Sequence, residues 1–184
     1  MNKIKSKNGL KGQAMMEYLM TYGFAIFVIV VILAVLAFYL PQFVNTPATC
    51  LFDKTEFDCQ DRPPALIADS SNNVELVIKV QNNDNRAILV TRALCTVVPK
   101  AEIKKGTPFE TAFSPELKVA AGASTPDNWK SFKCSSKTGQ DRLSLTANSE
   151  FRGHFVIWYK YEDDLPGVPE RKSTAVLTGR VLEK

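Results

Sequence analysis

The residues of this chain that could do chemistry are few and scattered. His154 is the only histidine, and no serine or cysteine stands in a recognisable nucleophile motif, so a Ser–His or Cys–His hydrolase is not indicated. Glu162, Asp163 and Asp164 could attract a calcium ion, but they lack the ligand spacing of a known calcium loop. We therefore interpret His154 as structural, and the acidic run, like Asn82–Asn85, as a solvated turn. We expect no catalytic residue, no metal site and no cofactor.

The four cysteines have the clearest chemistry. None of the four cysteines, Cys50, Cys59, Cys95 and Cys134, belongs to a CxxC motif. Their spacing therefore does not favour a zinc site. An even number of cysteines after an apolar export segment favours disulfides instead. Of the three possible pairings we favour Cys50–Cys59 with Cys95–Cys134, because each closes the shorter available loop. On the chain-entropy model these bonds would contribute about 3 and about 4 kcal/mol to stability. Buried free thiols are the alternative.

The element that organises the chain is the apolar segment from Lys11 to Leu40. Phe24 to Leu40 are seventeen consecutive apolar residues without a charge. With the mostly apolar turn before them they make about 28 residues, or about 42 Å of helix, which is more than a bilayer requires. No face of this helix is polar, so apolar material must surround it on every side. We predict a helix over residues 13–41, ending near Pro41.

The charges of the chain are concentrated before this helix. Lys3, Lys5, Lys7 and Lys11 are four of the 23 basic residues, and the other 19 balance the 19 acidic residues. The remaining chain is neutral, which gives no electrostatic reason to expect nucleic-acid binding. The lysines form a basic flank that is expected to keep the N-terminus in the cytoplasm and to send the residues beyond Leu40 outward.

The segment before the apolar run carries a family resemblance. Lys11-Gly12-Gln13-Ala14-Met15-Met16-Glu17-Tyr18, continued by Leu19–Ile26, resembles the class III signal peptide of archaeal type IV pilins over about thirty residues. In that family a membrane aspartyl peptidase cuts after the glycine on the cytoplasmic side and leaves the helix attached. The resemblance implies a cleaved leader of residues 1–12, with Lys11, Gly12 and Gln13 as the processing site.

The same resemblance gives Glu17 a role in assembly. It becomes the fifth residue of the mature chain, and in bacterial type IV pili the family model pairs this carboxylate with the amine of a neighbour's first residue, here Gln13. Such a pair would set the axial register and relieve a carboxylate that costs about 2.5–3.5 kcal/mol inside hydrocarbon. Two alternatives stay open: Glu17 complements the helix macrodipole, or it stays hydrated at the headgroups. Cyclisation of Gln13 to pyroglutamate would also remove the amine.

Beyond a linker at residues 42–49, the pattern changes from continuously apolar to alternating. Short runs rich in β-branched and aromatic residues, separated by turn signals, predict an antiparallel β-sandwich of the immunoglobulin-like kind over residues 50–184. The whole chain is then α+β, a hydrophobic helix followed by a β head. The predicted strands are Val74–Val80, Ala87–Thr91, Cys95–Val98, Leu117–Val119, Leu143–Ala147, His154–Tyr161 and Thr174–Leu182. We expect Val156 and Trp158 in the core, and Trp129 as a hydrophobic plug under a loop, with an exposed adhesive contact as the alternative.

Together these features predict a structural subunit of an extracellular archaeal type IV-like pilus, acting in adhesion or cell–cell contact. The expected partners are identical subunits in a helical polymer, the prepilin peptidase, the assembly machinery and the membrane of the precursor. One rival is an uncleaved, monomeric surface domain that is anchored in the membrane and binds a ligand. A second rival, an exported enzyme on a tether, has no motif to support it. No strict N-x-S/T sequon offers a glycosylation site.

Overall fold

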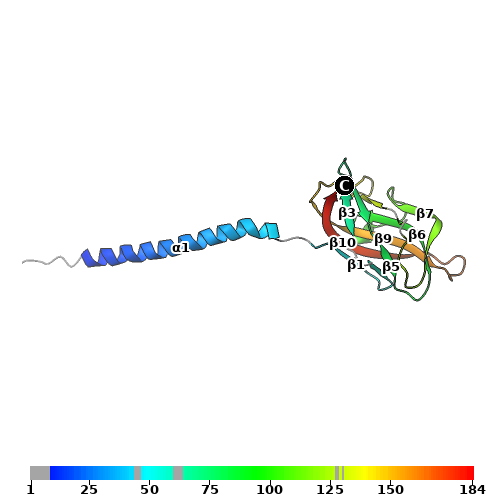
Figure 1. Cartoon of the computed structure of the whole chain (residues 1–184), viewed down its shortest axis with the longest axis horizontal. Helices are drawn as coiled ribbons and strands as arrows, with labels where there is room; N and C mark the ends of the chain where they lie inside the picture. The colour runs from blue at the N-terminus through cyan, green and yellow to red at the C-terminus, as the bar shows by residue number, and fades with distance from the viewer. Residues whose placement is uncertain (1–8, 44–46, 60–63, 127–128, 130) are drawn as a thin grey trace, which may run out of the picture. The chain divides into compact units, whose positions relative to one another are not determined.

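The computed structural model describes residues 9–43, 47–59, 64–126, 129 and 131–184 of the 184-residue chain. The chain divides into two compact units, Met1–Asn45 and Thr46–Lys184 (Figure 1). The first unit contains one apolar helix and the second is rich in strands, as predicted. Each unit is described below by itself.

The helical unit is a single α-helix, α1 (Gly9–Phe43). It begins before and ends after the predicted range of 13–41, and it continues for two residues beyond Pro41. Its backbone satisfies its own hydrogen bonds, which is the condition for a segment that is placed in an apolar medium. The side chains described in this helix are Met16, Tyr18 and residues 20–39.

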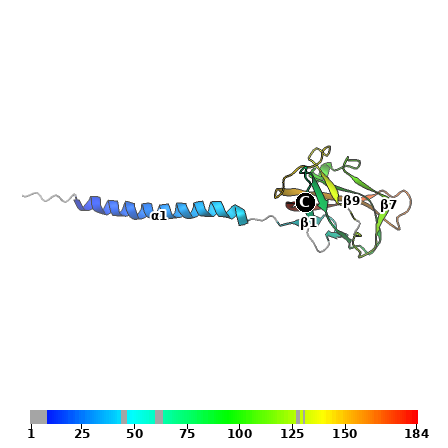
Figure 2. The ribbon, with the colours of Figure 1, turned by 45° about the horizontal axis from the view of Figure 1, so that its top comes forward.

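The second unit, called the head below, contains the strands. They are β1 (Thr49–Phe52), β2 (Phe57–Cys59), β3 (Ala65–Ala68), β4 (Val74–Val77), β5 (Val80–Asn82), β6 (Ile88–Thr96), β7 (Thr111–Val119), β8 (Phe132–Ser135), β9 (Glu150–Tyr161) and β10 (Arg171–Glu183), with a short 3-10 helix, η1 (Lys100–Glu102). Strands β2 and β5 form a separate two-stranded ribbon, and the others belong to one sheet. β1 and β7 are the end strands of this sheet, and Figure 2 shows them on different sides of the head.

The sheet closes into a barrel, which corrects the prediction of an immunoglobulin-like sandwich. β10, β3, β4, β8, β6 and β9 pair in sequence, and β9 pairs with β10 to complete a ring of six strands. The closure comes from the two long strands. The middle of β10 pairs with β1, and its last residues, Val181–Glu183, pair in parallel with β3. In the same way, β6 pairs first with β7, and its last residues then pair in parallel with β8. A barrel of this kind leaves fewer open edges than two separate sheets.

The longest alternating runs of the sequence gave correct predictions. β6, β9 and β10 occupy the ranges predicted from 87–98, 154–161 and 174–182, although each strand is longer or merged. The predicted strand Val74–Val80 is divided into β4 and β5. The prediction of a strand at Leu143–Ala147 is wrong, since Ser144 makes only an isolated bridge to Asn73. That segment keeps the alternation of a strand but lacks a neighbouring strand that runs beside it.

Two apolar clusters stabilise the head. The larger one fills the barrel and includes Phe132, Phe155 and Tyr159, all essentially inaccessible to solvent. The smaller one lies on the outer face of β6 and β9 and consists of Leu94, Ile103, Val156 and Trp158. The prediction that Val156 and Trp158 lie in a core is therefore confirmed. It is the outer cluster that they occupy, because successive residues of a strand point to opposite faces.

Candidate functional site

The exposed surface of α1 is the most unusual feature of the described chain. Met20–Tyr39 is long and apolar enough to cross a membrane, and none of that span is buried inside the protein. Phe27, Ile29 and Val30, near its middle, each expose more than half of their surface. Exposed apolar area of this extent is unfavourable in water and marks a surface that lipid or protein covers.

The predicted processing and register residues lie at the start of this helix. The backbone of Lys11, Gly12, Gln13 and Glu17 is helical and belongs to α1. Their side chains lie outside the described residues, so the cut after Gly12 and the pairing of Gln13 with Glu17 stay predictions. Gly23 is described, and a Cβ atom added there would meet no atom of the described residues within 4 Å. Packing against those residues therefore does not require glycine at that position.

The four cysteines form two disulfides in the head, with the pairing that the loop lengths favour. Cys50 on β1 is bonded to Cys59 on β2, with their Cα atoms 6.1 Å apart. Cys95 on β6 is bonded to Cys134 on β8, at 4.4 Å. The second pair occupies directly opposite positions of parallel strands, one of the two junctions at which the barrel closes. It joins elements that lie 39 residues apart in the sequence.

The acidic turn after β9 is more structured than predicted. Asp164 accepts hydrogen bonds from the Arg171 guanidinium and from the backbone N–H of Tyr161, and the first of these in particular lowers the pKa of Asp164. Glu162 pairs with Lys118, and Asp163 lies 3.7 Å from Arg86. The three carboxylates thus face three different cations and do not converge on one point. Within the described ranges, no group of three or more His, Cys, Asp or Glu residues could hold a metal ion.

The turn at Asn82–Asn85 also departs from the prediction of a solvated loop. Asn82 is 1% exposed, and its side-chain amide donates hydrogen bonds to the backbone carbonyls of Arg86, Val119 and Ala120. Asparagine is frequent in turns because its side chain bonds nearby backbone groups in this way. The run of polar letters gave no signal that one of them is buried.

Two tyrosines of β9 join this turn and the β1–β2 turn to the barrel. Tyr159 donates a hydrogen bond to Glu56, and Tyr161 donates one to Asp84 Oδ2 at 2.6 Å. Burial, followed by the adjacent carboxylate, raises the pKa of both tyrosines, so they stay protonated donors. The guanidinium carbons of Arg86 and Arg171 lie 3.4 and 4.5 Å from the centre of the Tyr161 ring.

We did not single out this tyrosine cluster from the sequence. Its signal is the spacing of two residues between Tyr159 and Tyr161, which places both on the inner face of one strand. Glu56 comes from the β1–β2 turn, Asp84 and Arg86 from the turn between β5 and β6, and Arg171 from the start of β10, so only the folded chain brings them together. The hydrogen bonds of Tyr159 with Glu56 and of Tyr161 with Asp84 fasten the two turns to the barrel.

His154 is half-buried on the outer face of β9. Desolvation first, and then the positive charge of Lys100, lowers its pKa. Its Nδ1 atom is buried without a hydrogen-bond partner among the described residues. The interpretation of His154 as structural stays a prediction.

Trp129 is buried beneath its loop, as the plug interpretation predicted. The indole is 7% exposed and stacks on Phe113, with the ring centres 5.4 Å apart. Phe132 packs against it edge-on. The alternative of an exposed adhesive tryptophan is therefore wrong.

Comparisons with known proteins give no independent guide to function. No protein-family model, no curated protein and no solved structure matches the chain.

Proposed function

We propose that this protein is the structural subunit of an extracellular pilus of the archaeal type IV kind. It would be processed by a prepilin peptidase after Gly12 and polymerised through α1. In the filament the heads would face outward and act in adhesion or cell–cell contact. Glu17, paired with the amine of Gln13 in a neighbouring subunit, would set the register of the helices.

The observation that carries this proposal is that Met20–Tyr39 of α1 is apolar on every side and that none of this span is buried by the described residues. A plain bilayer anchor needs such a surface once, in lipid. A pilin needs it twice, first in lipid and then among identical helices, where close packing replaces lipid contact. The Lys11–Glu17 segment in the first turns of α1 supports the second use, because a simple anchor has no need of that pattern.

The head supports an extracellular setting. Two disulfides in a unit of this size are typical of proteins that fold in an oxidising compartment. The barrel is also self-sufficient, since its two apolar clusters are covered by the head's own segments. A subunit whose head is complete before assembly needs only its helix to polymerise.

One observation favours the alternative of an anchored binding domain. A groove of about 450 Å³ runs beside the edge strand β7, lined in part by Phe113, Leu117 and Trp129. A groove with aromatic walls could hold an extended apolar segment of another molecule. The pilin proposal remains the better one, because an anchored binding domain would not account for the residue pattern of the Lys11–Glu17 segment.

Intact mass and N-terminal sequencing of protein sheared from the cell surface test the proposal. A mature chain that begins at Gln13 or its pyroglutamate form, recovered from filaments, is the expected result. The pyroglutamate form would remove the amine from the register model while leaving the processing model intact. A chain that still carries Met1 or Lys11 and occurs only in membranes would overturn the pilin proposal in favour of the anchored domain.

A further inference from the structure

We propose that the head docks on a phospholipid surface through one patch of its sheet while α1 spans the bilayer. The patch is the exposed part of the outer face of β1, β10 and β9, centred on Leu51 and Val176, and is called the β1 face below. The proposal rests on the membrane-inserted stage of the proposed function, and the anchored alternative shares that stage.

The β1 face is defined by strand register. Leu51 of β1 lies directly opposite Val176 of β10, which lies opposite His154 of β9. These positions point away from the barrel, because Cys50, Ala175 and Leu177 beside them belong to the inner core or pack on it. Leu51 is 69% exposed and Val176 is 39% exposed. The head thus presents an apolar cross-strand pair to the outside.

The other half of the same outer face is covered by the protein itself. The segment around η1 crosses it and buries Ile103 against Val156 and Trp158. Ion pairs of Lys100 with Asp53 and of Lys105 with Glu170 fix this segment at its two sides. The cover ends before Leu51 and Val176, so that part of the sheet is apolar without a cover from the described chain.

The length of the connecting chain decides which occupant fits the β1 face. Residues 44–48 separate the last residue of α1 from β1, and five residues reach at most about 18 Å. When the span Met20–Tyr39 lies in a bilayer, the head is therefore held within a short distance of the lipid surface. Leu51 lies two residues beyond Thr49, at the point where the chain enters the head. The exposed apolar pair is thus tethered to the membrane by its own chain.

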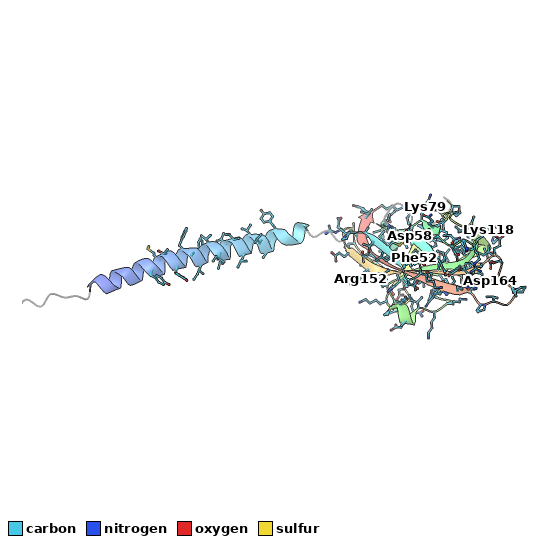
Figure 3. All side chains as sticks on the ribbon, turned by 90° about the horizontal axis from the view of Figure 1, so that it is seen from below. Phe52, Asp58, Lys79, Lys118, Arg152 and Asp164 are labelled. Atoms are coloured by element: carbon cyan, nitrogen blue, oxygen red, sulfur yellow. A yellow bond between two sulfur atoms is a disulfide. The ribbon has the colours of Figure 1, made fainter. Side chains whose placement is uncertain are left out.

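The polar surroundings of the pair suit lipid headgroups. Arg152 lies two residues before His154 on the same face of β9, opposite Thr178, and its side chain is exposed. Through Thr178, Arg152 is in register with Thr49, the first residue of β1. Figure 3 labels Arg152 at one end of the head, with Lys118 and Asp164 at the other. A guanidinium binds phosphate oxygens in a bidentate manner. Aliphatic side chains beside a cation are the usual composition of a protein surface that lies at the interface of a membrane.

Tryptophan scanning of the full-length chain in phospholipid vesicles tests the proposal. The vesicles contain phosphatidylcholine and phosphatidylglycerol with acyl chains brominated close to the headgroup, which quench nearby indoles. The variants are Leu51→Trp and Val176→Trp, with Leu165→Trp as the matched control. Leu165 is a leucine of the same head, 77% exposed, in the turn between β9 and β10. Ile29→Trp, with lipids brominated at the bilayer centre, reports whether α1 is inserted.

We expect several-fold stronger quenching of Leu51→Trp and Val176→Trp than of Leu165→Trp, and loss of most of this difference when Arg152→Gln is added. Equal quenching at the three head positions, with Ile29→Trp quenched, would overturn the docking proposal alone. A blue shift at Leu51→Trp that grows with protein density and shows no bromine quenching would assign the β1 face to a second copy and also overturn it. If Ile29→Trp is not quenched, α1 is not inserted in the bilayer. That result would overturn the membrane-inserted stage and, with it, the proposed function.

Discussion

The helix and the head differ in the burial of their apolar side chains. In the head, large side chains such as Phe132, Phe155 and Tyr159 are buried by other parts of the same chain. In α1, the described apolar side chains of Met20–Tyr39 are all left uncovered. The head therefore covers most of its large apolar side chains itself, whereas the described apolar side chains of the helix are left for another molecule or lipid to cover. A substitution in the helix should therefore change membrane insertion and assembly, and a substitution in the head should change the stability of the head.

The largest effect is expected from a charge in the middle of α1. Val30→Lys places an ammonium where the helix must be surrounded by apolar material, at a cost of about 2.5–3.5 kcal/mol for insertion. We expect loss of vesicle flotation and of filaments, with no change in the thermal unfolding of the head. The matched control is Val77→Lys, a partly exposed valine of β4, which should leave flotation unchanged. A Val30→Lys protein that still forms filaments would show that the helix is not their core.

A smaller effect, confined to the head, is expected from opening the barrel disulfide. Replacing Cys95 and Cys134 together by serine should reduce the free energy of unfolding by about 4 kcal/mol, because a loop of 39 residues is no longer closed in the unfolded chain. Denaturant titration in detergent measures this, and the fluorescence of Trp129 and Trp158 reports the head alone, since both tryptophans lie there. The matching change at Cys50 and Cys59 should cost about 3 kcal/mol. Equal stability of all three proteins would rule out the entropic account.

The smallest effect is expected from pH, again in the head only. His154 has a folded-state pKa below its ordinary value of 6.5, so the folded head favours the neutral ring. Its contribution to stability is therefore complete above about pH 6.5 and is lost as the pH falls through the lower, folded-state pKa. The melting temperature of the wild type should fall more between about pH 7 and about pH 5 than that of His154→Gln. Parallel curves for the two proteins would contradict the prediction. Residues 24–38 of α1 have no titratable side chain and should show no such dependence.

The sequence predicts those parts of the fold whose signal is local. α1 follows from a continuous apolar run, and β9 and β10 follow from long alternating runs separated by clear turn residues. The short strands β3 and β8 are different, because four residues give little periodicity. β3 pairs along its whole length with the nearby β4, but its pairing with β10 and the pairing of β8 with β6 join segments far apart in the sequence, and the closure of the barrel depends on these two pairings. A sandwich was therefore expected where the long strands in fact bend to meet the short ones.

The features of the candidate site also divide into those that the sequence predicts and those that depend on the folded chain. The apolar helix and the cysteine pairing could be predicted, because length, composition and loop size are properties of the sequence itself. The β1 face could not, because the exposure of Leu51 depends on where the η1 segment stops covering the sheet. The tyrosine cluster could not either, since Glu56 and Asp84 reach β9 only through the β2–β5 ribbon.

The bond between Cys50 and Cys59 has a mechanical consequence. A pull on α1 enters the head at Thr49, and one residue later it reaches a cysteine that is covalently joined to β2. Tension then passes from Cys50 directly to Cys59, so residues 51–58 lie outside the load path. Asp53, which accepts hydrogen bonds from the Thr174 N–H and the Ser173 hydroxyl, lies in that shielded loop. While the bond is intact, a load on the anchor cannot peel β1 from β10 one residue at a time, and resistance to force begins at the first residues of the head.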